Sequence, residues 1–233
     1  MNMISRLKNE IKNNPKSKLS YLIACIYSLC GLNKIVVKRG NLINKKNCYM
    51  KHCRIEVYGK NNIIDFGEAA NYLTNCHLYI NGNNNHIVLG ERNVLINGEL
   101  WIEDDNGTIS FGNRNKILGR THIAVIEGTS VTFGDECLFS TDVVLRTGDS
   151  HSILDADTLK RINPSKSIVV GNKVWFGNKS IVLKGVSISD DCIVATGAVV
   201  SKPIDQNSIV AGNPAKVIRQ GIKWDVKRIS HDK

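Results

Sequence analysis

The sequence predicts an all-β fold in which short strands wind into a parallel solenoid. The first observation is a repeat of short apolar blocks ending in glycine, and the second is a six-residue repeat of apolar residues in the last third of the chain. The blocks occupy residues 63–67, 87–90, 108–112 and 130–134, and the spacings between their final glycines are 23, 22 and 22. A fixed period of this length is typical of solenoids, whose successive coils bury one another's apolar faces.

The six-residue repeat predicts how each coil is built. Apolar residues stand six apart at Val170, Phe176, Val182, Ile188, Val194 and Val200, and mostly small residues follow each of them by four positions. We expect each apolar residue to point into the stack, while its small neighbour lets the chain turn a tight corner. Three such hexads close one triangular coil of a parallel β-helix. Trp101, six residues after Leu95, is expected to point inward by the same count.

Composition supports a folded chain of this class. The 233 residues suit one domain with an appendage, and 42% hydrophobic with 22% charged residues is typical of globular chains. Aromatic residues make up only 6%, against 19 glycines, which favours short strands and tight corners over long helices.

Positive charge is concentrated at the N-terminal end. The net charge is +10, and residues 1–51 hold 11 Lys or Arg against the single acid Glu10, so basic and acidic residues balance over the rest of the chain. A basic segment of this kind favours anionic membrane surfaces, anionic polymers or phosphate-bearing ligands. The sequence contains no base-stacking or groove-reading motif, so we expect no nucleic-acid partner.

Residues 4–30 are predicted to be helical, with a break near Pro15. An apolar stripe forms at helical spacing, and its run of about 14 residues is shorter than the ~20 needed to span a bilayer. The stripe comprises Leu19, Leu22, Ile23, Ile26, Leu29 and Cys30. Packing on the end of the solenoid is the favoured role, and peripheral contact with a membrane is the alternative.

The seven cysteines are odd in number and include no CxxC pair, so we expect neither a disulfide framework nor a metal site. Cys137 and Cys192 are expected to be small buried residues. The chain is expected to be cytoplasmic, with the inner face of the membrane as an alternative location.

We divide the chain into a basic, partly helical segment at 1–40, a solenoid at 41–215 and a basic tail at 216–233. The six-residue repeat breaks between Leu145 and Val170, because their separation exceeds four hexads by one position. The polar stretches 149–153 and 161–164 fall in this break. They predict an extruded loop at about 148–167, and loops on rigid scaffolds are where chemistry tends to sit.

The motifs of the C-terminal half resemble those of the hexapeptide-repeat acyltransferases. The resemblance rests on residues 170–177 (VGNKVWFG), 181–186 (IVLKGV), 194–202 (VATGAVVSK) and 211–219 (AGNPAKVIR), and it is dense from about 133 to 219. It implies a left-handed β-helix, acetyl-CoA as co-substrate and a homotrimer with sites at the subunit boundaries. The earlier coils, as their glycine spacing shows, are longer than the three hexads that are ideal in the family.

His151 is the candidate catalytic residue. It precedes Trp175 by the length of four hexads, as in family members acting on sugar hydroxyls, and Asp-Ser-His with Arg-Ile-Asn-Pro resembles bacterial polysaccharide O-acetyltransferases in particular. A sugar hydroxyl is too weak an acid to attack a thioester unaided, so a base must remove its proton. An imidazole, with an ordinary pKa of about 6.5, suits that task at neutral pH.

Three further residues complete the candidate catalytic set. Asp149 and Asp142 are candidates to orient the imidazole of His151; alternatively Asp149 makes a turn and Asp142 occupies a coil corner. The resemblance places Trp175 at the mouth of the site, where its ring would stack on a sugar or wall the pantetheine arm, or fill the interface between subunits.

The resemblance also implies where acetyl-CoA binds. An extended pantetheine needs a surface of small side chains, and the phosphates need cations. The candidates are Gly177, Asn178, Ala195, Thr196 and Ser201 for the arm and Lys202, Lys216 and Arg219 for the nucleotide end. Lys216 stands where some relatives have Arg, which replaces a bidentate contact with a point charge. Solvated surface charge is the alternative for all three.

The sequence therefore predicts an acetyl-CoA-dependent O-acetyltransferase acting on a hydroxyl of a bacterial surface polysaccharide, capsule or O-antigen, or its sugar precursor. N-acetylation of an amino-sugar nucleotide is the main alternative. The same fold hosts a zinc-dependent carbonic anhydrase, but only His151 lies in the right region, and three convergent histidines would be needed. A non-catalytic binding scaffold is the remaining alternative.

Overall fold

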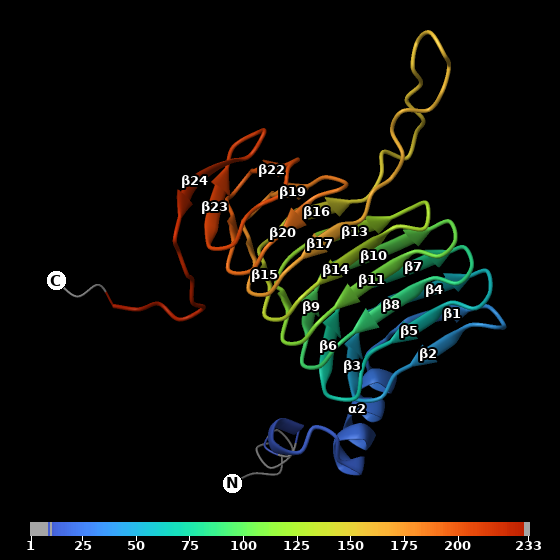
Figure 1. Cartoon of the computed structure of the whole chain (residues 1–233). Helices are drawn as coiled ribbons and strands as arrows, with labels where there is room; N and C mark the ends of the chain where they lie inside the picture. Colours follow the sequence, from blue (N-terminus) through green and yellow to red (C-terminus); the bar gives the residue numbers. More distant parts are fainter. Residues whose placement is uncertain (1–8, 10, 231–233) are drawn as a thin grey trace.

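The chain forms a three-sided parallel solenoid of about eight turns, which confirms the predicted fold class (Figure 1). The computed structural model describes residues 9 and 11–230. Within the described residues, the strands of successive coils pair in parallel, and the last two strands of the chain pair antiparallel. The left-handed winding that the resemblance implies remains a prediction.

Each side of the solenoid is one sheet, and successive strands of a sheet come from successive coils. Sheet I contains β1 (Lys34–Val37), β4 (Arg54–Tyr58), β7 (His77–Asn81), β10 (Gly98–Glu103), β13 (Thr121–Val125), β16 (Val143–Arg146), β19 (Ile181–Val182) and β22 (Val199–Val200). Sheet II contains β2 (Leu42–Asn44), β5 (Ile63–Asp65), β8 (His86–Leu89), β11 (Thr108–Phe111), β14 (Ser130–Phe133), β17 (Ile168–Val170) and β20 (Ser187–Ile188). Sheet III contains β3 (Cys48–Lys51), β6 (Asn71–Thr74), β9 (Val94–Ile96), β12 (Lys116–Ile117), β15 (Leu138–Phe139), β18 (Trp175–Phe176), β21 (Ile193–Val194), β23 (Ser208–Ala211) and the antiparallel β24 (Lys216–Gln220).

The hexad prediction is confirmed in the core. All six apolar anchors from Val170 to Val200 are at most 3% exposed, and stacked rings such as Phe139 and Phe176, with centroids 4.7 Å apart, run between coils. All seven cysteines are free thiols, and Cys137 and Cys192 are buried as predicted. The core is therefore a column of apolar side chains that each coil extends by one layer.

The prediction for Trp101 is wrong, because its side chain points outward from β10. Leu100 and Ile102 on either side of it are fully buried. The count of six from Leu95 fails because Asn97, with a φ of 57°, turns the corner early and β10 begins at Gly98. Side chains alternate along a strand, so an odd shift moves the whole set to the other face.

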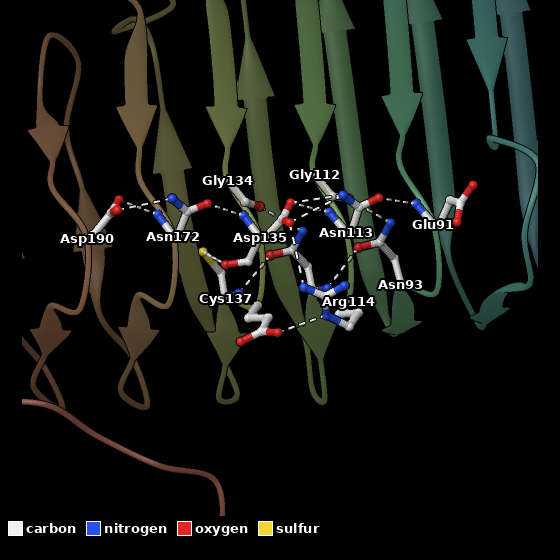
Figure 2. Close-up of polar contacts among 12 residues, drawn as sticks. Glu91, Asn93, Gly112, Asn113, Arg114, Gly134, Asp135, Cys137, Asn172 and Asp190 are labelled. Atoms are coloured by element: carbon white, nitrogen blue, oxygen red, sulfur yellow. Dashed lines mark hydrogen bonds and ion pairs between the residues drawn. The ribbon is translucent and has the colours of Figure 1, made fainter.

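Buried asparagines support the corners of the longer coils. Asn93 and Asn115 are fully buried, and each donates its amide to the carbonyl of a glycine in the next coil, Gly112 and Gly134, at 3.0 Å. Figure 2 shows this ladder beside an outer row of polar side chains, in which Asn113 accepts from the Glu91 amide at 2.9 Å. Backbone groups turned away from the sheets at a corner need such partners when they are buried.

The helix α2 (Lys18–Cys30) packs on the N-terminal end of the solenoid (Figure 1). Pro15 lies in the turn that precedes it, as predicted, while the expected helix at 4–8 lies outside the described residues. Contact with the coil runs through Ala24, which is 1% exposed, and Ser20, whose carbonyl accepts from the Tyr49 hydroxyl at 3.1 Å. The predicted stripe is mostly on the other side: Leu19, Leu22, Ile26 and Leu29 are 46, 54, 53 and 83% exposed.

The solenoid extends beyond the boundaries expected from sequence. β1 begins at Lys34, inside the segment assigned to the N-terminal appendage, and β24 lies inside the assigned tail. No helix within residues 9 and 11–230 is long and apolar enough to cross a membrane.

Candidate functional site

The chain leaves the solenoid between β16 and β17, at the corner of sheets I and II, and forms the loop that the broken hexad predicted (Figure 1). The loop is a narrow hairpin in which Leu154 and Arg161 pair antiparallel. The two strands of the hairpin are joined near its base by Asn163, whose side chain is 7% exposed. The Asn163 side-chain NH₂ donates to the carbonyl of His151 and to Asp149 Oδ2, both at 2.8 Å. Asn163 Oδ1 in turn accepts from the Ile153 amide at 2.8 Å. The buried side-chain amide of Asn163 thus holds the backbone at His151 and at Ile153.

His151 lies exposed on this loop. Among residues 9 and 11–230, no side chain or backbone group forms a hydrogen bond with its imidazole; only its carbonyl is engaged, by Asn163. Both ring nitrogens are therefore accessible to a substrate or to another chain.

Asp149 is engaged with groups other than the His151 imidazole. Its Oδ2 lies 2.5 Å from Lys184 Nζ, which comes from the next coil and also donates to the Asn163 carbonyl at 3.1 Å. Lys184, followed by the Asn163 amide, holds the pKa of the Asp149 carboxyl below its ordinary value. Asp149 ties the loop to the solenoid instead of orienting the imidazole in this chain.

Asp142 occupies a coil corner, the alternative stated from sequence. Its φ is 59°, and its Oδ1 accepts from Arg120 Nε at 2.8 Å. The structure brings it to the corner of sheets III and I, between β15 and β16, away from the corner that carries the loop.

Trp175 projects from the outer face of sheet III, 39% exposed, with its ring centroid 5.9 Å from that of Trp224. In a triangular coil, sheet III lies opposite the corner between sheets I and II where His151 is carried. One chain therefore does not bring these two candidate residues together.

The candidate acetyl-CoA residues fall into three groups. Gly177, Asn178, Ala195 and Thr196 stack in adjacent coils at the corner of sheets III and I. A Cβ on Gly177 would lie 2.6 Å from the Thr196 amide nitrogen, so only glycine fits there, and Asn178 Oδ1 is buried with no hydrogen-bond partner in the described part of the chain. Ser201 and Lys202 lie exposed at the corner of sheets I and II, and Lys216 and Arg219 lie exposed on β24.

Two residues of this site were missed from sequence. The sequence marks Asn163 only as part of a polar stretch and does not indicate that its side chain is buried. Lys184 gave no local signal, because it lies 35 residues from Asp149 and meets it only through the stacking of coils. Within residues 9 and 11–230, no group of three His, Cys, Asp or Glu is arranged to bind a metal ion. A zinc-dependent carbonic anhydrase would need three convergent histidines.

The three-sided coils and the extruded histidine loop define a hexapeptide-type β-solenoid, the architecture of an acyltransferase class. No family model matches the sequence. The polysialic acid O-acetyltransferase of Escherichia coli O1:K1 is 34% identical over 107 residues, which cover 46% of this chain and 35% of that protein. The putative lipopolysaccharide biosynthesis O-acetyl transferase WbbJ of Escherichia coli K12 is 27% identical over 83% of this chain and 90% of that protein.

A solved structure agrees with these sequence matches. The polysialic-acid-specific acetyltransferase NeuO superimposes with a TM-score of 0.79 at 26% identity, over 85% of this chain and 91% of that one. The chain is therefore similar in sequence to hexapeptide-repeat O-acetyltransferases of polysialic acid and lipopolysaccharide, and similar in fold to a solved polysialic acid acetyltransferase.

Proposed function

We propose that the chain transfers an acetyl group from acetyl-CoA to a hydroxyl of a bacterial surface polysaccharide, such as a capsule or O-antigen, or of its sugar precursor. The observation that carries this proposal is His151, which is held on a stapled loop with a free imidazole. Of the relatives similar in sequence, one is named a polysialic acid O-acetyltransferase and another a putative O-acetyl transferase of lipopolysaccharide biosynthesis. Because the match to the first of them covers about a third of that protein, activity, acceptor and assembly are all part of the proposal.

His151 acts as the general base. Its imidazole takes the proton of the acceptor hydroxyl as the oxygen attacks the thioester carbonyl, which produces a tetrahedral oxyanion. Collapse of that intermediate breaks the C–S bond, and the imidazolium returns its proton to the leaving thiolate. The products are an acetyl ester and free CoA, so no proton or electron is left unbalanced.

The corner that carries Gly177 and Asn178 suits a pantetheine arm. Its side chains are small, and a polar atom, Asn178 Oδ1, is without a partner in the described part of the chain. Lys202, Lys216 and Arg219 are exposed cations that would meet the phosphates.

The working unit in this proposal is a homotrimer. His151 and Trp175 lie on opposite sides of one solenoid, so a site that uses both requires two chains, with the loop of one reaching sheet III of the next. Cyclic threefold packing of triangular prisms supplies three such contacts. The enzyme would work in the cytoplasm, where acetyl-CoA is made and sugar precursors are assembled.

The test is an acetyl-transfer assay with a panel of bacterial polysaccharides and amino-sugar nucleotides as acceptors, read by mass spectrometry. An acetyl product on a polysaccharide or sugar precursor that mild base removes is the expected result, because esters hydrolyse under those conditions and amides do not. A base-stable product would establish N-acetylation instead. No product with any acceptor would leave the scaffold alternative standing.

A further inference from the structure

The outer face of sheet I carries an aromatic stripe that the proposed chemistry does not use. Tyr79 and Trp101 pack with ring centroids 4.4 Å apart, and His77 and His122 flank Trp101 at 5.3 and 6.3 Å. Each histidine is paired with a carboxylate on a neighbouring strand, His77 with Glu56 and His122 with Glu99, both at 3.0 Å. The two histidines are therefore held as fixed walls of the stripe.

The stripe ends in a notch next to the catalytic loop. Trp101, Ala124 and Arg146 are register partners on three consecutive strands of sheet I. The small Ala124 lies between Trp101 and Arg146, and the backbones of the two outer strands are two strand spacings, roughly 9.5 Å, apart. The cavity has a volume of about 220 Å³ and is lined by Trp101, Glu103, His122, Ala124, Ile126, Arg146, Gly148 and Ser150.

The notch is chemically suited to one sugar residue. Tyr79 packs on the Trp101 indole from one neighbouring strand, and Ala124 is the register partner of Trp101 on the other. Trp101 lines the cavity, so its ring offers a stacking surface for the C–H face of a pyranose. The volume is below the roughly 300–1,000 Å³ of pockets for drug-sized ligands, and so suits a single ring.

Some polar groups around the notch already have a hydrogen-bond partner in the chain, and others do not. Arg146 is exposed and forms no ion pair within residues 9 and 11–230, so it is available to an acidic substituent. Glu103 and Ser150 are exposed and are placed to bond sugar hydroxyls, while His122 is already paired with Glu99. The Trp101 Nε1 is buried without a hydrogen-bond partner in the described part of the chain, a cost that a phenylalanine would avoid.

We propose that this notch is a glycan subsite that binds one acidic sugar residue of the acceptor, stacked on Trp101 with its acidic group on Arg146. The inference rests on the proposed function and deepens it. Gly148 and Ser150 belong both to the wall of the notch and to the base of the loop, so a glycan held here has its neighbouring residues next to His151. The notch would thus select an anionic chain and set which residue is presented.

The test measures glycan binding without acetyl-CoA, by calorimetry, so that it does not depend on turnover. The probes are a sialic acid oligomer and a neutral galactose oligomer of equal length. Ala124→Leu, which fills the notch, is expected to raise the Kd for the sialic acid oligomer about tenfold, a stacking-sized loss. Arg146→Gln is expected to weaken the sialic acid oligomer and leave the neutral oligomer unchanged. Trp101→Phe keeps a ring and is expected to retain most of the binding.

Val88→Leu is the matched control, because Val88 is an exposed outward residue of sheet II and the change adds a methylene away from the notch. Wild-type affinity in both Ala124→Leu and Arg146→Gln, or no binding of either oligomer by the unmodified protein, would overturn the subsite. If glycans bind as expected but no acetyl transfer is found, the subsite stands and the proposed function fails. If transfer occurs and the KM for the acceptor is unchanged in Ala124→Leu, the function stands and the subsite fails.

Discussion

His151 and Trp175 lie on opposite sides of the same solenoid, one on the loop at the corner of sheets I and II and the other on the outer face of sheet III. Coils stack along an axis, so residues of neighbouring coils stay on the side on which their strand or corner places them. A catalytic site using both residues therefore has to be completed by another chain.

Mixed trimers test this arrangement. His151→Ala and Trp175→Ala, each expected to be nearly inactive alone, should regain about a quarter of wild-type activity when coexpressed in equal amounts, because one site in four pairs an intact histidine with an intact tryptophan. Coexpression of two differently tagged His151→Ala chains is the control. Light scattering that shows a fully active monomer would rule out a shared site.

His151→Ala is expected to lower kcat by about 10²- to 10⁴-fold, the range for loss of a general base. The imidazole makes no hydrogen bond within the described part of the chain, so the melting temperature and the Kd for acetyl-CoA should not change. Retention of more than a tenth of wild-type kcat would count against the base.

The ion pair between Asp149 and Lys184 is expected to stiffen the loop and contribute little to global stability. Both side chains are partly exposed, at 41% and 22%, so Lys184→Met should lower the free energy of unfolding by less than about 1 kcal/mol. Tryptic cleavage at Lys160 and Arg161 in the loop should become faster, with Lys179→Met as the control.

The same pair sets a pH dependence. The pKa of Asp149 is lower in the folded chain, so its stabilising effect is complete above the ordinary pKa of an aspartate and is lost as the pH falls through the lowered value. Loop cleavage, followed with an acid-active protease, should therefore accelerate only in acid. Equal cleavage rates in Lys184→Met and wild type at neutral pH would contradict the tie.

Charge reversal at Lys202, Lys216 and Arg219 is expected to raise the KM for acetyl-CoA about tenfold or more and to change kcat little. These cations would bind the distant nucleotide end equally in the ground and transition states. The matched control is Lys166→Glu at an exposed position on the loop side. A loss confined to kcat would reject the assignment of the three cations.

Contact with an anionic membrane is the role we expect for the exposed side of α2. Burying each exposed Leu or Ile contributes about 1.5–3 kcal/mol, so Leu22→Ser with Ile26→Ser should weaken binding to phosphatidylglycerol vesicles at least about tenfold in cosedimentation. Phosphatidylcholine vesicles and Val169→Ser, at an exposed position on sheet II, are the controls. Equal sedimentation of the double variant and wild type would contradict membrane contact.

The sequence by itself determined the solenoid, its inward positions in the last third and the place of the extruded loop. These features follow from period: a residue every six positions points inward because each short strand and corner repeats without insertion, and the irregular spacing between Leu145 and Val170 must leave the stack. Pro15 likewise ended a helix where its ring prevents one from continuing.

Only the tertiary structure decided the features that depend on how coils meet. Trp101 faces outward because Asn97 turns the corner one step early, which local spacing does not reveal. Asp149 pairs with Lys184 because the next coil brings that side chain to the loop. The helix α2 packs on the coil end through Ala24 and leaves most of its leucine stripe exposed, which its helical spacing alone does not show. Stacking makes neighbours of residues far apart in sequence, so partners across coils are set by the register between coils and not by the order of residues along the chain.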